Sequence, residues 1–347
     1  MDLISLDDVS RAAEVLAGVA VHTPLLPAPW AARGRPGAPA IGDDAAVGGS
    51  ASGGSAGAGA PGEFWVKPES LQPIGAFKIR GAYFAIASLP AARRAAGVIT
   101  HSSGNHAQAV AYAARAFGVP CVVVMPDVAA PMKIAATEAL GARVVLVAPP
   151  EREPATLKLA AAEGYSIIPP YDHPDVIAGQ GTVGLEIVAD LPVVDVVLVP
   201  VGGGGLASGV ATAVKALRPS ATVIGVEPEL AADAQESLRE GRVVTWSTER
   251  TYRTVADGLR TPTSELTLAH LAARLDGIIT VTEDEILDTV GALARSARLV
   301  VEPSGAVSVA AYLYHRAELP AGRTVAVISG GNLDPALLAR LLAPAGD

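Results

Sequence analysis

The chain has 347 residues, of which half are hydrophobic and 18% are charged, and its formal net charge is −9 at pH 7. This length suits about two domains, and the negative charge argues against a nucleic-acid partner, because phosphate binding needs clustered Lys and Arg. No apolar run approaches the ~20 residues that span a bilayer, and the acidic start lacks the basic flank of a secretory signal, so we expect a cytoplasmic protein with no membrane partner.

The N-terminal part is predicted to contain one helix, one low-complexity segment and one strand. Residues 5–20 show the apolar periodicity of an amphipathic helix and begin with a capping box. Residues 34–62 are almost only Gly, Ala, Ser and Pro, a composition that cannot build a core and that predicts a flexible insertion. A strand over residues 63–67 then leads the chain to Lys78.

Residues 97–173 alternate between predicted strands and helices, which indicates a parallel sheet and a small domain. The single cysteine, Cys121, is expected to be a buried strand residue and not a nucleophile. The predicted strands cover residues 98–100, 121–125, 143–147 and 165–168, and the predicted helices cover residues 107–117, 131–140 and 154–163.

A second strand–helix series follows residue 174, and with residues 1–96 it is predicted to form a large domain (1–96 plus 174–347). A long stretch before residue 278 is expected to be partly irregular. Predicted strands cover residues 196–201, 222–227, 278–281 and 324–328, and predicted helices cover 184–190, 206–217, 283–296 and 304–315. The fold class is therefore α/β, with a mostly parallel sheet flanked by helices in each domain.

Lys78 lies in a mostly apolar run that begins as a turn and continues as a helix. Burial there would disfavour the charged form, lower the pKa of the amine and make it a nucleophile able to form a Schiff base with an aldehyde cofactor. On this segment alone, a helix-start lysine that reaches out to water is the simpler explanation.

Four consecutive glycines, Gly202, Gly203, Gly204 and Gly205, separate a predicted strand from a predicted helix. Bare backbone allows several N–H groups to converge on an anion, and the helix adds the positive end of its dipole. A tight turn is the alternative, but it needs fewer glycines. The run matches neither a Walker loop nor a dinucleotide-binding turn, so we predict a phosphate site.

Two polar segments follow other predicted strands. The segment Ser102-Ser103-Gly104-Asn105-His106 suits a carboxylate or a ring oxygen, although a helix N-cap is the alternative. His106 is given no catalytic role. Ser329, after the last strand, can hydrogen-bond a neutral ring nitrogen, or it can cap a helix.

Together, in this order, these motifs resemble those of fold-type II pyridoxal 5′-phosphate (PLP) enzymes (tryptophan synthase β-like), in the threonine/serine dehydratase and serine racemase family. The resemblance covers residues 20 to 335. It implies that Lys78 forms the Schiff base, that Gly202–Gly205 bind the phosphate, that Asn105 contacts the 3′-oxygen and that Ser329 pairs with the pyridine nitrogen.

The resemblance also implies a substrate site. The Ser102–His106 loop (Ser102, Ser103, Asn105 and His106) would receive the substrate carboxylate, Gly258 would lie near the substrate side chain, and Glu302 would lie beside the cofactor.

Two further matches are to the racemase-like branch. Ser103 stands where many threonine dehydratases have alanine. Glu227, the Ala231 carbonyl and Asp233 match a divalent-cation site whose oxygen ligands suit Mg²⁺, Mn²⁺ or Ca²⁺. An exposed acidic turn is the alternative for these three residues.

Two features depart from the family pattern: the insertion at 34–62, and Tyr171, which stands where racemase-like enzymes place Asn. No regulatory domain is expected after the core. We expect a β-eliminating ammonia-lyase (dehydratase) acting on a small β-hydroxy amino acid such as threonine or serine, and a homodimer. The alternatives are a serine or amino-acid racemase, a dehydratase of 3-hydroxyaspartate or phenylserine, and a PLP-binding protein without activity.

Overall fold

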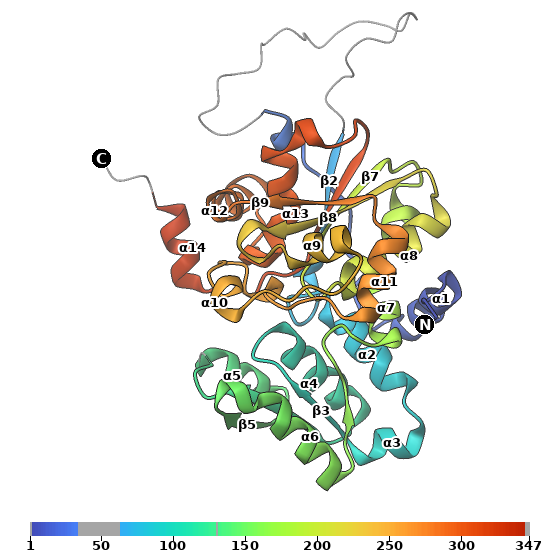
Figure 1. Cartoon of the computed structure of the whole chain (residues 1–347), viewed down its shortest axis with the longest axis vertical. Helices are drawn as coiled ribbons and strands as arrows, with labels where there is room; N and C mark the ends of the chain where they lie inside the picture. The colour runs from blue at the N-terminus through green and yellow to red at the C-terminus, as the bar shows by residue number, and fades with distance from the viewer. Residues whose placement is uncertain (1, 34–62, 130, 344–347) are drawn as a thin grey trace, which may run out of the picture.

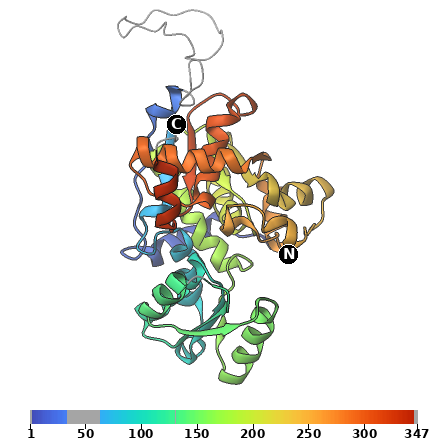
Figure 2. The same cartoon turned by 90° about the vertical axis from the view of Figure 1, so that its left-hand side faces the viewer.

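The computed structural model describes residues 2–33, 63–129 and 131–343, and the predicted insertion at 34–62 lies outside them. The described residues form two sheets, each flanked by helices (Figure 1). Figure 2 shows the same two parts from the side, one above the other. Among the helices of these residues, none combines the length and the hydrophobicity needed to cross a membrane.

The larger sheet has six strands in the order β1-β2-β10-β7-β8-β9, and every pair is parallel except β1 with β2. Alternate residues of β7 enter two different cores. Val196 and Leu198 pack with α12 (Glu283–Ala292) and α13 (Pro303–Tyr314), whereas Val197 and Val199 pack with α7 (Pro174–Asp190) and α8 (Gly205–Leu217). The strands are β1 (Leu26–Pro27), β2 (Phe64–Pro68), β7 (Val196–Pro200), β8 (Thr222–Pro228), β9 (Gly277–Val281) and β10 (Thr324–Ile328).

The smaller sheet is wholly parallel, in the order β5-β4-β3-β6. Cys121 is buried in β4 as predicted, and burial raises the pKa of its thiol to about 12, so it is not a nucleophile at neutral pH. The strands are β3 (Val98–His101), β4 (Cys121–Pro126), β5 (Arg143–Val147) and β6 (Ser166–Ile167).

One helix lies where the two parts meet. Helix α2 (Lys78–Ser88) packs on α4 (Asn105–Phe117), so its apolar side chains join the core of the small sheet, and it also packs on α7 (Pro174–Asp190). The predicted domain boundaries at residues 97 and 173 stay a prediction.

Helix α7 shows the largest difference from the prediction. It spans residues 174–190, whereas only residues 184–190 are predicted to be helical. Glycines in its first half lower the intrinsic helix propensity, but here they allow close packing. A Cβ added to Gly179 would lie 2.6 Å from the Arg80 carbonyl oxygen, and one added to Gly209 of α8 (Gly205–Leu217) would lie 2.3 Å from that of Ile177. The glycines therefore let helices approach closely and do not break α7.

The stretch before residue 278 is also more regular than predicted. It contains α9 (Asp233–Glu240), α10 (Thr248–Thr251) and α11 (Glu265–Arg274), which begins with a capping box at Ser264. The other helices are α1 (Leu6–Leu16), α3 (Ala91–Ala96), α5 (Pro131–Ala139), α6 (Arg152–Glu163), α12 (Glu283–Ala292), α13 (Pro303–Tyr314) and α14 (Pro335–Leu342), which was not predicted.

A buried group of charged side chains joins β2, α2 and α7. The Arg80 guanidinium lies 2.7 Å from the carboxylate of Glu69 and 2.6 Å from that of Glu186, which is also 2.6 Å from the Lys67 ammonium group. Burial alone would raise the pKa of Glu69, but the ion pair with Arg80 holds it below its usual value. Charge-assisted contacts of this kind are short and directional, so they fix the first turn of α2, where Lys78 lies.

Candidate active site

The predicted site segments all follow the carboxyl ends of parallel strands or lie beside them. Gly202–Gly205 follow β7, Ser329 follows β10, and Ser102–His106 follow β3. The backbone N–H of Phe77 donates to the Ser329 carbonyl at 3.1 Å, which places Lys78, the next residue, beside the end of β10. Ligands bind at this edge in open parallel sheets.

Lys78 is partly buried, and within the described part of the chain its amine has no carboxylate partner. Its Nζ donates to the Pro170 carbonyl oxygen at 2.6 Å. Burial lowers the pKa of this amine to about 8, and its position at the first residue of α2 also disfavours a positive charge. About a tenth of the amine is therefore uncharged and nucleophilic at pH 7, far more than for an ordinary lysine.

The glycine run has the features of an anion site. Within the described residues, the backbone N–H groups of Gly202, Gly203 and Gly204 donate no hydrogen bond, although Gly202 and Gly204 are buried. Buried N–H groups are nearly always paired, so these donors indicate a missing acceptor. Gly204 has a left-handed φ of 84°, and Gly205 begins the 13-residue helix α8, whose positive dipole end adds to the site.

Tyr171 lies directly against this run. A Cβ added to Gly203 would lie 2.6 Å from the Tyr171 ring, and one added to Gly205 would lie 2.9 Å from the Tyr171 Cβ. Burial raises the pKa of the Tyr171 hydroxyl to about 12, so the phenol stays protonated at neutral pH. The segment before α7 thus contacts Lys78 through Pro170 and the glycine run through Tyr171.

A chain of hydrogen bonds holds Asn105. Its side-chain amide donates to Glu302 at 2.7 Å, and its side-chain oxygen accepts from Asn332 at 2.7 Å. Burial, with a smaller contribution from Asp257, raises the pKa of Glu302 to about 7. The side chain of Asn105 is therefore fixed at the edge of the site.

Ser329 and Gly258 meet at Ser304. The buried Ser329 hydroxyl donates to the Ser304 carbonyl at 3.3 Å, and the Gly258 backbone N–H donates to the Ser304 hydroxyl at 2.9 Å. A Cβ added to Gly202 would lie 2.8 Å from the Cα of Leu259, so the Gly258 turn also touches the glycine run. The structure thus brings both predicted residues to the same site.

The predicted carboxylate loop is only partly available to a ligand. Ser102 and Ser103 are partly exposed, and the Ser102 hydroxyl accepts from the Gly104 N–H at 3.2 Å. The side chain of His106 is buried and bonded to the Ile168 carbonyl at 2.9 Å, and burial lowers its pKa to about 3. A ligand could therefore meet His106 only through its backbone, so the predicted contact of this residue with the substrate does not involve its side chain.

The predicted metal ligands lie together at the start of α9. Glu227 is buried and accepts from the backbone N–H groups of Ala234 at 3.0 Å and Gln235 at 2.7 Å, yet burial raises its pKa well above the usual value. Burial also raises the pKa of Asp233 to about 6, and its Oδ2 has no partner among the described residues. Those residues contain no cluster of three His, Cys, Asp or Glu ligands, so a cation here would depend on two carboxylates and the Ala231 carbonyl.

Sequence reasoning did not find Pro170, Ser304 or the pairing of Asn105 with Glu302. These contacts join segments that are distant in the sequence. Asn332, which holds Asn105, is different. It lies in the polar, glycine-containing segment Ser329–Asn332, which the sequence had already indicated as part of the site.

These residues fit PLP. The Lys78 amine, which has no carboxylate partner among the described residues, could react with its aldehyde, and the unpaired N–H groups of Gly202–Gly204 could bind its phosphate. Both features are observed independently of any likeness to other proteins.

Comparisons with known proteins agree. Residues 50–330 match the family model described as "Pyridoxal-phosphate dependent enzyme". The chain is 41% identical to L-threo-3-hydroxyaspartate ammonia-lyase of Saccharomyces cerevisiae, over 81% of this chain and 86% of that protein. It is 41% identical to serine racemase of Schizosaccharomyces pombe, over 78% and 84%.

The crystal structure of a threonine deaminase from "T.th." superposes with a TM-score of 0.83 and 40% identity, covering 95% of this chain and 99% of that one. The predicted α/β fold class is confirmed by this likeness. The chain therefore belongs to the fold-type II PLP-dependent enzymes, in the family that contains threonine and 3-hydroxyaspartate ammonia-lyases and serine racemases.

Proposed function

We propose that this protein is a β-eliminating ammonia-lyase that converts a small β-hydroxy amino acid, threonine or serine, into a 2-oxo acid and ammonia. The observation that carries the proposal is the amine of Lys78. It is partly buried, has no carboxylate partner among the described residues, and donates to Pro170, whose neighbour Tyr171 lies against the glycine run. The family membership supports the proposal, and so do two relatives: the 3-hydroxyaspartate ammonia-lyase supports the type of reaction, and the threonine deaminase supports the substrate.

Each site residue has a role in this proposal. When bound, PLP supplies an electron-withdrawing system that acidifies the α-proton of an attached amino acid. The Gly202–Gly205 N–H groups would hold its phosphate, Asn105 its ring oxygen and Ser329 its ring nitrogen. Uncharged Lys78 Nζ would take the α-proton as a general base, and the Ser102–His106 loop, through Ser102, Ser103, Asn105 and backbone N–H groups, would orient the substrate carboxylate. The β-hydroxyl would leave from the adjacent carbon as water while the electron pair of the broken Cα–H bond forms a Cα=Cβ bond. Addition of water to the released product would then give the 2-oxo acid and ammonia.

The uptake of PLP by the cofactor-free protein should depend on the ionisation of Lys78. Because the pKa of this amine is lowered to about 8 and only the uncharged amine attacks an aldehyde, the rate should rise roughly tenfold per pH unit below pH 8 and level off above it. Stopped-flow absorbance measures the rate, with Nα-acetyl-lysine as the control whose rise continues to about pH 10. A protein rate that kept rising in parallel with this control would contradict a lowered pKa.

Racemisation is the second candidate function, and Ser103 favours it. Racemisation needs a proton donor on each face of the planar reacting carbon, and Lys78 serves one face. The Ser103 side chain is partly exposed and has no hydrogen-bond partner among the described residues. Its hydroxyl is thus available to a substrate, and this candidate function requires that it serve the other face.

Replacing Ser103 by alanine should separate the two reactions. Elimination needs only the lysine face, so release of 2-oxo acid should fall by less than about tenfold, whereas racemisation should fall by about 10²-fold or more, the size of a lost general acid–base group. Coupled keto acid assays and chiral chromatography measure both rates in one sample. Loss of elimination with the cofactor still bound would refute this division of roles.

A screen of substrates tests the proposed function itself. L-Threonine, L-serine, 3-hydroxyaspartate and phenylserine, each with its enantiomer, are offered to the holoenzyme, and ammonia, keto acid and product chirality are measured together. Fastest release from threonine or serine supports the proposal. Preference for 3-hydroxyaspartate, racemisation without release, or no turnover would each replace it with a different function.

We also propose that the chain acts as a homodimer, and light scattering would test this. A separate proposal is that Glu227, Asp233 and the Ala231 carbonyl bind Mg²⁺, Mn²⁺ or Ca²⁺. The unpartnered, buried Asp233 Oδ2 supports the metal site, because a buried carboxylate without a partner is costly.

Removal of the cation should destabilise the protein. A ligand that binds only the folded state adds RT ln(1 + [L]/Kd), about 2.7 kcal/mol at 100 Kd. EDTA should therefore lower the Tm of the wild type but leave that of the Glu227→Ala/Asp233→Ala double variant unchanged. If both proteins respond equally to EDTA, these residues do not form the site.

A further inference from the structure

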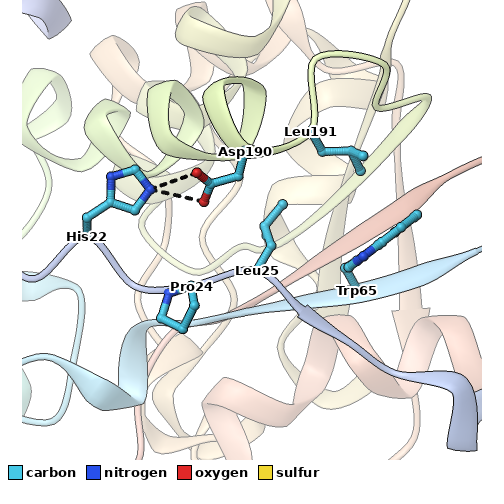
Figure 3. A pocket seen from close by; sticks show the side chains of 6 residues that line it. All are labelled: His22, Pro24, Leu25, Trp65, Asp190 and Leu191. Carbon is cyan, nitrogen blue, oxygen red and sulfur yellow. Dashed lines mark hydrogen bonds and ion pairs between the residues drawn. The ribbon is translucent and has the colours of Figure 1, made fainter.

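A pocket lies at the C-terminal end of α7, away from the candidate active site. It has a volume of about 400 Å³ and is lined by His22, Pro24, Leu25, Trp65, Asp190 and Leu191 (Figure 3). This volume lies in the range of small-molecule sites, roughly 300–1,000 Å³. Asp190 ends α7, whereas the active-site residue Tyr171 precedes its start. The 17 residues of α7 separate the two sites by roughly 25 Å.

Asp190 is the acidic group of this pocket. Its two carboxylate oxygens face the Nε2 of His22 at 2.9 and 3.0 Å, as Figure 3 shows. Its side chain is 29% exposed and that of His22 is 55% exposed, so solvent or a ligand can reach both. On its inner side, Asp190 lies 4.0 Å from the Lys67 ammonium group, which is closer to Glu186, at 2.6 Å.

The charges behind the pocket do not balance. Two cations, Lys67 and Arg80, face three carboxylates, Glu69, Glu186 and Asp190. These five side chains, counted without His22, therefore carry one negative charge in excess. Asp190 is the most exposed of the three carboxylates, because Glu69 is fully buried and Glu186 is 14% exposed. An added cation would thus bind at Asp190.

The apolar side chains that line the rest of the pocket indicate which kind of cation it would bind. Leu25 and Leu191 present aliphatic carbon, and Trp65 adds an indole whose face can attract a positive charge. An inorganic ion would leave this apolar wall in water, and an anion would be repelled by Asp190. We infer that the pocket binds a protonated aliphatic amine, with the nitrogen on the Asp190 carboxylate and the carbon body against Leu25, Trp65 and Leu191.

Calorimetric titration of the holoenzyme at pH 8 with N-methylpiperidinium chloride tests this site. A tertiary amine is used because it cannot react with the cofactor's aldehyde. For a ligand of this size we expect a Kd on the order of 1 mM. Tetrahydropyran, an uncharged ring, and KCl, a cation without an apolar body, should each bind at least about tenfold more weakly, because a hydrogen bond to a charged group and apolar burial each contribute that much.

Variants locate the binding. Asp190→Asn should weaken binding by about tenfold or more, whereas Asp284→Asn, on an exposed aspartate of α12, should not. His22→Ala should bind at least as tightly, because His22 occupies the same oxygens. Trp65→Leu is a second variant, expected to weaken binding if Asp190→Asn fails to fold, as judged by circular dichroism. The inference would be overturned if the amine gave no heat of binding below about 50 mM, or if tetrahydropyran bound equally well. It would also be overturned if folded Asp190→Asn bound the amine as tightly as the wild type, or if His22→Ala lost binding.

Discussion

Replacing Lys78 by alanine should abolish ammonia release from every β-hydroxy amino acid, by a factor on the order of 10³ or more, because general-base catalysis contributes about 10²–10⁴. The amine of Lys78 combines a pKa lowered to about 8 with a hydrogen bond to a neutral carbonyl instead of a carboxylate. The variant should also lose the covalent attachment of PLP, which mass spectrometry detects after borohydride reduction.

Lys158 offers a matched control, since it is an exposed lysine of α6. Lys158→Ala should keep both the attachment and the turnover. If Lys78→Ala retains covalent cofactor, or if it still releases ammonia at a rate near that of the control, the central assignment is wrong.

Replacing Gly203 by valine should cost the protein its cofactor. A side chain at this position would meet the Tyr171 ring at 2.6 Å and would stand among the unpaired N–H groups of the glycine run. Each hydrogen bond to a charged group is worth about 1.5–3 kcal/mol, so the loss of one or two predicts PLP affinity about 10²-fold weaker. Equilibrium dialysis, followed by absorbance of the bound cofactor, measures this affinity.

Two further variants show whether the effect is local. Gly277→Val, in the edge strand β9 where an added Cβ meets no atom within 4 Å, should leave PLP affinity unchanged. The double variant Tyr171→Ala/Gly203→Ala removes the clashing ring and should recover part of the affinity that Gly203→Val loses. Unchanged affinity in Gly203→Val itself would remove the phosphate assignment.

Local sequence features predict much of the fold. Strand β5 begins and ends at the predicted residues 143 and 147, because a β-branched run between turn residues is a local signal. Helix α7 is the clearest miss, since its glycines are explained only by the helices that pack against them. Local propensity cannot distinguish a glycine that ends a helix from one that admits a neighbour.

Some residues of the candidate site can be predicted from local sequence, and others cannot. Lys78 and the glycine run are visible in the sequence because a lysine in an apolar run and four successive glycines are locally unusual. The carbonyl of Pro170, which accepts from Lys78, and the carboxyl of Glu302, which holds Asn105, are brought there by folding. His106 also shows that sequence alone does not predict the direction of a side chain. Its place in the loop suggests contact with a substrate, but its side chain is buried and bonded to the Ile168 carbonyl.

The position of β10 in the large sheet has a consequence for biosynthesis. This strand lies between β2 and β7, yet it is the last strand of the described chain to leave the ribosome. Until residues 324–328 are available, β2 has only the two-residue β1 as a neighbour, and the sheet that supports Lys78 and Ser329 stays open. Contacts of such long sequence separation form late and slowly. The nascent chain therefore completes its cofactor site only after residues 324–328 have emerged from the ribosome. Until then, exposed valine-rich strands such as β7 and β8 lack their full set of neighbours, and chaperones would limit aggregation in that period.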